Sequence, residues 1–284
     1  MRSPEFVGIG CRRCASSWVH NYLFNHPQVG KHRGGLHFFS NSFDKGFDWY
    51  LNSLSDYKEN KILLEYSVSY SYPEHYKVVA KRIAKYLPDT KLFMTVRNPI
   101  GRAHSDYLRS IRRGEYPVEL KFEDAIIKYP ELIQRGMYSK ILKAYLEFYP
   151  KENIKVFFYF DLKKSEKKYT ENLCSFLNID AIEPVKEEST VPKKGRAIKS
   201  KTYNNIVLAS KKTFDATANF FGIQKHWANF KKSNQKSYQK ALALNSTKGE
   251  TIKEETKKQL IDIYKQDILA FQELTNTNLE SWLK

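Results

Sequence analysis

Short apolar runs alternate with segments of helical spacing along this chain. Four runs, at residues 5–10, 61–65, 91–96 and 154–160, predict strands. The first is apolar and ends in glycines, as a central strand that feeds a loop does. The last is rich in the β-branched and aromatic residues that pack well on a pleated sheet.

Segments with apolar residues three and four positions apart lie between these runs and predict helices. The first carries Trp18, Val19, Tyr22 and Leu23 on one face and stops before Pro27. Further helices are expected through Val79, Ile83 and Leu87 to Pro88, and over residues 122–127, 138–148, 169–177 and 251–274. Strands that alternate with helices predict one α/β domain over residues 1–284, with a mostly parallel sheet flanked by helices.

The composition fits a domain with a sizeable core and no membrane span. Of the 284 residues, 41% are hydrophobic and 14% aromatic, and no stretch approaches the roughly 20 apolar residues that cross a bilayer. The N-terminus lacks the layout of a secretory signal. Residues 183–201 are rich in Lys, Glu, Pro and Ser and predict a loop. We expect a soluble, cytoplasmic protein.

Lys and Arg outnumber Asp and Glu by 48 to 31, which gives a net charge of +17. Such a charge attracts polyanions and speeds their association. It leaves open a solvated surface or a site for an anionic cofactor, a glycan or nucleic acid, and no nucleic-acid motif singles out the last.

The loop after the first predicted strand is the first candidate site. Its sequence is Gly8-Ile-Gly-Cys-Arg-Arg-Cys-Ala-Ser-Ser-Trp18, and it leads into a helix. A helix N-terminus offers free backbone N–H groups and a partial positive charge, so Arg13, Ser16 and Ser17 are expected to hold a phosphate there. The alternative is that the serines only cap the helix. The nucleotide triphosphatase pattern G-x-x-x-x-G-K-[ST] is absent.

Cys11 and Cys14 form a C-x-x-C pair, which is compatible with a redox dithiol or half a metal site. Neither a second cysteine pair nor a histidine pair completes a zinc site in the sequence, and we expect no metal. Three cysteines cannot form a disulfide framework for a chain of this size, so packing must stabilise it.

The second candidate site follows the strand predicted at residues 91–96. Arg97 lies at the C-terminal end of that strand, where open α/β sheets bind ligands. With Pro99, Arg102, Ser105 and Tyr107 it forms R-x-P-x-x-R-x-x-S-x-Y. This spacing resembles the 3′-phosphate-binding motif of sulfotransferases that use 3′-phosphoadenosine-5′-phosphosulfate (PAPS). The resemblance implies a P-loop-like sulfotransferase fold, with Arg97 and Ser105 on the 3′-phosphate.

The first loop resembles the 5′-phosphosulfate loop of the same family, and Asn25-His26-Pro27 follows its helix as the family pattern requires. Arginine replaces the family's lysine at position 13, which leaves electrostatic help to the leaving group as its catalytic role. Other landmarks are Arg135-Gly-Met-Tyr138 and a basic glycine loop. The resemblance assigns the cofactor to Arg12, Arg13, Cys14, Ala15, Ser16, Ser17, Trp18, Arg97, Ser105, Tyr138, Lys194, Gly195 and Arg196.

One departure from the family concerns the catalytic base. In its glycan-modifying members a glutamate lies two residues before the histidine of an H-F-F segment, and here that position is Gly35. Either His37 replaces it, or Glu65 reaches in, or catalysis is weak or lost. His37 is the preferred base, because its ordinary pKa of about 6.5 lets it accept a proton near neutrality.

The resemblance predicts in-line transfer of a sulfuryl group from PAPS to a hydroxyl or amine, with a carbohydrate expected as acceptor. The product would be 3′-phosphoadenosine-5′-phosphate (PAP). The aromatic residues Trp49, Tyr50, Tyr70 and Tyr72 line an acceptor site or belong to the core. The alternative is a catalytically impaired relative that binds nucleotide or polyanion. A Golgi-lumen location is expected if the chain was cut from an anchored protein.

Overall fold

The computed structural model describes residues 2–30, 35–54, 61–184, 196–198, 200, 202–203, 206, 246–248 and 251–284. The chain divides into two compact units, each described by itself. The first comprises Met1–Ala103, Tyr129–Pro192 and Glu254–Lys284, and the second comprises His104–Lys128 and Lys193–Lys253.

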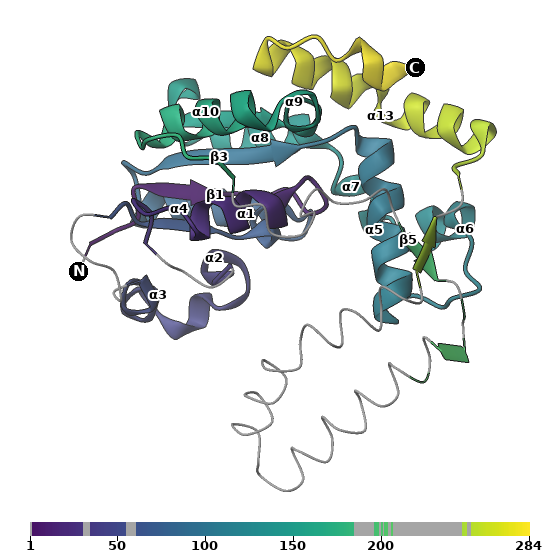
Figure 1. Ribbon diagram of the computed structural model, residues 1–284, viewed down its shortest axis with the longest axis horizontal. Helices are drawn as coiled ribbons and strands as arrows, with labels where there is room; N and C mark the ends of the chain where they lie inside the picture. Colours follow the sequence, from purple (N-terminus) through teal and green to yellow (C-terminus); the bar gives the residue numbers. More distant parts are fainter. Residues whose placement is uncertain are drawn as a thin grey trace, which may run out of the picture. The chain divides into compact units, whose positions relative to one another are not determined.

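The first unit is built on a parallel sheet with the strand order β2-β1-β3-β4. Val7 in the central strand β1 lies opposite Glu65 in β2 and Leu92 in β3. The arrows of β1 and β3 run in the same direction in Figure 1. The predicted α/β fold with a parallel sheet is confirmed. The strands are β1 (Phe6–Gly8), β2 (Leu64–Tyr66), β3 (Lys91–Val96) and β4 (Ile154–Phe158).

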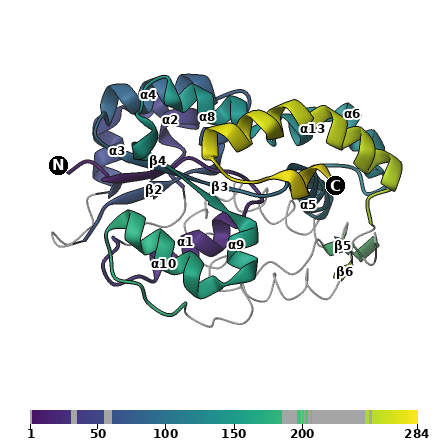
Figure 2. The ribbon, with the colours of Figure 1, turned by 90° about the horizontal axis from the view of Figure 1, so that it is seen from above.

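Helices cover both faces of this sheet (Figure 2). One face is covered by α1 (Ser16–Phe24), α9 (Tyr159–Lys164) and α10 (Glu166–Leu177). Its core joins Trp18 and Tyr22 of α1 to Phe93 of β3, Phe157 of β4 and Leu173 of α10. The opposite face carries α4 (Tyr76–Tyr86), α8 (Tyr138–Leu146) and α13 (Glu254–Thr275), with α8 packed between the other two.

Shorter elements follow the strands and close the first unit. They are α2 (Phe38–Asn41), η1 (Phe43–Lys45), α3 (Phe47–Leu54), η2 (Val68–Ser71), α7 (Glu131–Gln134), η3 (Lys151–Asn153) and η4 (Glu280–Leu283). Helix α5 (Pro99–Arg113) begins in this unit and continues into the second. Asn98 caps its start by accepting hydrogen bonds from the backbone N–H groups of Ile100 and Gly101. The second unit also holds α6 (Phe122–Lys128) and the antiparallel pair β5 (Arg196–Ile198) and β6 (Ser246–Lys248).

Two boundaries differ from the predictions. Strand β4 ends at Phe158, because the chain turns there into α9, where Tyr159 is buried but Phe160 is 39% exposed. Aromatic residues pack into a core equally well from a strand and from a helix. The apolar run at residues 154–160 therefore did not show where β4 ends and α9 begins. The loop predicted at residues 183–201 contains β5, which is held by backbone pairing with β6. No helix in the described part of the chain combines the length and hydrophobicity that crossing a bilayer requires.

Candidate active site

The two predicted anion-binding segments lie at the same edge of the sheet. Beyond the end of β1, the backbone of Cys11 donates to Thr95 O at 2.9 Å, and Thr95 N donates to Gly10 O at 2.8 Å. The loop that joins β1 to α1, residues 9–15, therefore stays paired with β3. Arg97 follows directly after β3. Parallel pairing thus brings the loop and Arg97 together, although they are far apart in sequence.

The conformation of loop 9–15 leaves the start of α1 open. Arg13 and Ala15 adopt positive φ angles of 69° and 66°, a region in which residues other than glycine are strained. Ala15 is the N-cap of α1 and makes no side-chain capping bond. Ser16 and Ser17 are therefore the first helical residues and not its cap. The first backbone N–H groups of a helix have no intrahelical partner, so they are available to an anion.

The charges of three guanidinium groups act on the thiol of Cys14. Burial raises the pKa of this thiol, and the positive charges of Arg102, Arg97 and Arg13 oppose that rise. Arg102 is fully buried and donates to Leu132 O. The Arg97 guanidinium lies 5.2 Å from the centre of the Tyr159 ring. Loop 9–15 and the end of β3 therefore contribute positive charge to one place.

Tyr138, at the start of α8, joins these two segments from beneath. Its hydroxyl donates to the backbone oxygen of Arg97 at 2.8 Å and lies 3.5 Å from the sulfur of Cys14. The side chain is 1% exposed. Tyr138 is thus placed to hold the two anion-binding segments in register, whereas its predicted contact with the cofactor remains a prediction.

His37 lies in a turn that is fixed by serines from the segment that follows strand β2. Its backbone adopts a positive φ of 53°, and its N–H donates to Ser67 Oγ at 2.8 Å. Its ring atom Nδ1 lies 2.6 Å from Ser69 Oγ. Ser67 N donates to Gly8 O at 3.0 Å, which attaches this segment to the end of β1. His37 is partly exposed, and burial lowers its pKa.

Glu65 lies beneath the His37 turn and is fully buried. Its Oε1 accepts hydrogen bonds from Leu36 N at 3.2 Å and from the hydroxyl of Ser67. Its Oε2 has no hydrogen-bond partner in the described part of the chain. Burial is the main cause that raises the pKa of this carboxyl to about 7. These contacts support a role in holding the turn, and a direct catalytic role stays a prediction.

Gly35 has no room for a side chain. A Cβ atom at this position would lie 2.6 Å from Ser67 Oγ and 2.8 Å from Tyr66 O. The carboxylate that the family pattern places here is therefore absent from the sequence and also excluded by the packing of the turn.

The remaining predicted residues divide among the core, the second unit and the part of the chain that is not described. The Trp18 ring packs in the core parallel to Tyr22, with the ring centres 5.7 Å apart. Ser105 is buried in α5 and belongs to the second unit. Lys194 and Gly195 lie outside the described residues, and Arg196 begins β5. The cofactor contacts of these residues stay predictions.

The four candidate aromatic residues divide between core and surface. Tyr50 and Tyr70 are fully buried, and Lys45 lies 4.3 Å from the centre of the Trp49 ring. Tyr72 is closer to the candidate site, because Arg12 donates to its hydroxyl at 3.5 Å and Arg135 lies 4.4 Å above its ring. Core packing thus accounts for Tyr50 and Tyr70.

The sequence predicted no site role for Ser40, Ser67 or Ser69, although Ser67 and Ser69 belong to a segment, residues 65–70, that resembles a family turn. Ser67 and Ser69 contact His37, while Ser40 Oγ lies 2.6 Å from Ser69 Oγ. That resemblance and their spacing of two along the chain after β2 are the signals that point to Ser67 and Ser69. Serines of this kind are common in turns, so only the fold shows what they contact.

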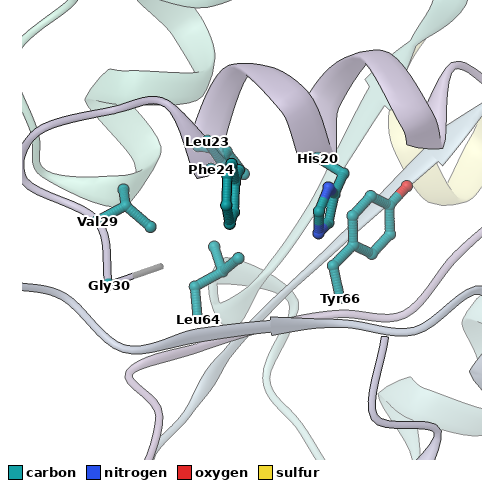
Figure 3. A pocket seen from close by; sticks show the side chains of 7 residues that line it. All are labelled: His20, Leu23, Phe24, Val29, Gly30, Leu64 and Tyr66. Atoms are coloured by element: carbon teal, nitrogen blue, oxygen red, sulfur yellow. The ribbon is translucent and has the colours of Figure 1, made fainter. Parts of the chain in front are cut away.

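A small apolar pocket lies between α1 and β2, apart from these residues. It is lined by His20, Leu23, Phe24, Val29, Gly30, Leu64 and Tyr66, and the rings of His20 and Tyr66 lie side by side in Figure 3. The Tyr66 hydroxyl donates to Gly10 O at 3.1 Å. The pocket contains none of the predicted site residues.

Cys11, Cys14 and Cys174 are free and buried. Within the described residues, no three side chains of His, Cys, Asp and Glu gather as metal ligands.

Comparisons with known proteins identify the fold and the family of this chain. A solved sulfotransferase from Alicyclobacillus acidocaldarius is similar over 100% of both chains, with a TM-score of 0.68 and 18% identity, which shows the fold. Human heparan sulfate glucosamine 3-O-sulfotransferase 3B1 is 30% identical over 154 residues, which are 52% of this chain and 39% of that protein. Human heparan sulfate glucosamine 3-O-sulfotransferase 5 is 30% identical over 166 residues, or 54% and 47% of the two chains. The chain thus spans less than half of these relatives. The family model for the sulfotransferase domain matches residues 4–266, and the chain belongs to this family.

Proposed function

We propose that this protein transfers a sulfuryl group from PAPS to a hydroxyl or amine of a carbohydrate by in-line displacement. The observation that carries the proposal is the meeting of loop 9–15 and Arg97 at one edge of the sheet. Two separate groups of positive charge and N–H donors suit a nucleotide that carries phosphate at both its 3′ and 5′ positions.

The residues at this edge fit such a donor. The open start of α1, with Arg13, Ser16 and Ser17, would bind the 5′-phosphosulfate, and Arg97 and Ser105 would bind the 3′-phosphate. PAPS supplies the activated sulfuryl group. Arg13 would stabilise the negative charge that develops on the leaving oxygen. Because arginine cannot donate a proton at neutral pH, this help would be electrostatic only. Tyr138 would hold this edge in place through its contacts with Arg97 and Cys14.

His37 is the proposed general base. It is partly exposed, it is fixed at its backbone and its ring, and its lowered pKa keeps it neutral at pH 7. Glu65 would position it through Leu36 and Ser67 rather than contact the acceptor. This arrangement compensates for the missing carboxylate at Gly35.

The carbohydrate acceptor is proposed from two observations. The similar human proteins are named as heparan sulfate glucosamine 3-O-sulfotransferases. The net charge of +17 would attract an anionic glycan. If the chain is part of an anchored protein, as its partial match to these relatives allows, the Golgi lumen is the proposed location.

Calorimetric titration with PAP beside ADP, at moderate salt, tests the donor site. We expect PAP to bind and ADP to bind at least tenfold more weakly, because only PAP carries the 3′-phosphate. Arg97→Ala removes a charge-assisted contact of about 2 kcal/mol, so PAP affinity should fall about 30-fold. Arg113→Ala is the matched control, since it removes the same charge from an exposed side chain.

Equal binding of both nucleotides with a steep salt dependence would contradict the proposal and indicate a polyanion-binding protein instead. Transfer of labelled sulfate from PAPS to heparan-type oligosaccharides, compared with small phenols, tests the acceptor. If the labelled sulfate were transferred to the phenol and not to the oligosaccharide, the carbohydrate assignment would be overturned.

A further inference from the structure

The hydrogen bonds around His37 determine which of its ring nitrogens carries the proton. Ser40 Oγ donates to the backbone oxygen of His37 at 3.1 Å, and it also lies 2.6 Å from Ser69 Oγ. A hydroxyl has one proton to donate. We assign the proton of Ser40 to the carbonyl, which can only accept, so that Ser40 Oγ accepts the proton of Ser69, although either hydroxyl could donate across that 2.6 Å contact.

The same count applies to the next contact. Ser69 gives its only proton to Ser40, so Ser69 Oγ accepts in its 2.6 Å contact with His37 Nδ1. Nδ1 must therefore carry hydrogen. In a neutral imidazole the other nitrogen, Nε2, then has a free lone pair.

We propose that Ser40 and Ser69 are positioning residues that fix His37 as the Nδ1–H tautomer and leave Nε2 to accept the proton of the acceptor. This inference deepens the proposed function and rests on it for the identity of the acceptor. The chain of bonds starts at the backbone carbonyl of His37, which can only accept. Ser69 is 2% exposed, which protects the chain of bonds from competing water.

The direct test is ¹⁵N NMR of protein labelled at histidine, recorded at a pH where the rings are neutral. The chain has seven histidines, and the His37 signals are those missing from a His37→Gln sample. We expect protonated Nδ1 and unprotonated Nε2 in the native protein. A protonated Nε2 would overturn the inference, whatever the activity.

Ser69→Ala should mix the two tautomers and lower kcat about tenfold, with the KM for PAPS unchanged. Ser69→Thr keeps the hydroxyl and should restore the tautomer and most of kcat. Ser53→Ala is the matched control, because Ser53 Oγ donates only to Trp49 O within helix α3. An unchanged tautomer in Ser69→Ala would also overturn the inference. If PAP did not bind, the proposed function would be contradicted. The NMR result would still decide which ring nitrogen of His37 carries the proton.

Discussion

At the scale of single residues, the turn that carries His37 is held by buried polar groups whose protonation matters for stability. Glu65 bonds Leu36 and Ser67 through Oε1. Its burial favours the neutral form, so the folded protein binds a proton at Glu65 more tightly than the unfolded chain does.

The pH dependence of stability follows from this difference. A carboxyl whose pKa is raised to about 7 contributes stability below its unfolded pKa and loses it as the pH rises through about 7. Between about pH 5 and pH 8 the contribution falls by roughly 2–3 kcal/mol. Glu65→Gln should flatten this part of the profile, as measured by urea unfolding at several pH values. The exposed Glu152 provides the control, and Glu152→Gln should leave the slope as in the native protein.

Gly35 gives a second prediction at this scale. Gly35→Ala places a methyl group against Ser67 Oγ and Tyr66 O, so the free energy of unfolding should fall by about 1–3 kcal/mol. Gly35→Glu should be at least as destabilising and should not increase sulfate transfer. A Gly35→Glu variant that is stable and more active would show that the turn can open to accept the family's carboxylate.

At the scale of elements, α13 stabilises the start of α8 and so supports Tyr138. Asp267 of α13 accepts hydrogen bonds from Ser139 Oγ at 2.6 Å, from Ser139 N at 3.2 Å and from Lys140 N at 3.4 Å. A carboxylate at a helix N-terminus also interacts favourably with the helix dipole.

Asp267→Ala should therefore destabilise the protein by about 2–3 kcal/mol, because it leaves the first N–H groups of α8 unsatisfied. It should also weaken PAP binding, since Tyr138 adjoins Ser139 and holds Arg97. Urea unfolding and calorimetry measure the two effects. Asp262→Ala, on the exposed side of the same helix, should change neither. If Asp267→Ala lowered the stability of the protein but left PAP binding unchanged, α13 would have no role in supporting the candidate site.

The elements also show what the sequence could and could not predict. Strand β3 has the predicted ends, because Lys91 is exposed at one end and Asn98-Pro99 stops the strand at the other. Strand β5 was not predicted, because a short polar segment becomes a strand only through pairing with β6. Pairing between distant segments has no local signal.

At the scale of the whole molecule, the family followed from motifs, whereas the contacts that support the candidate site did not. The Arg97 motif and loop 9–15 have spacings that can be read along the chain. The contacts of Tyr138 with Cys14 and of Ser69 with His37 join residues that are remote in sequence. Such contacts depend on how the helices pack on the sheet, so only the folded structure identifies them.

Cys14 belongs to loop 9–15 and its side chain is buried, so this thiol can report on the opening of the loop. An alkylating reagent can reach it only while the loop is open, so its labelling rate counts loop openings. Cys174 is a buried residue of helix α10 that lies 3.2 Å from the Tyr22 hydroxyl, so its labelling rate reports opening elsewhere in the protein. An anion bound at the start of α1 would slow the alkylation of Cys14 and leave the alkylation rate of Cys174 unchanged. Both thiols are native, so no probe has to be introduced into the protein.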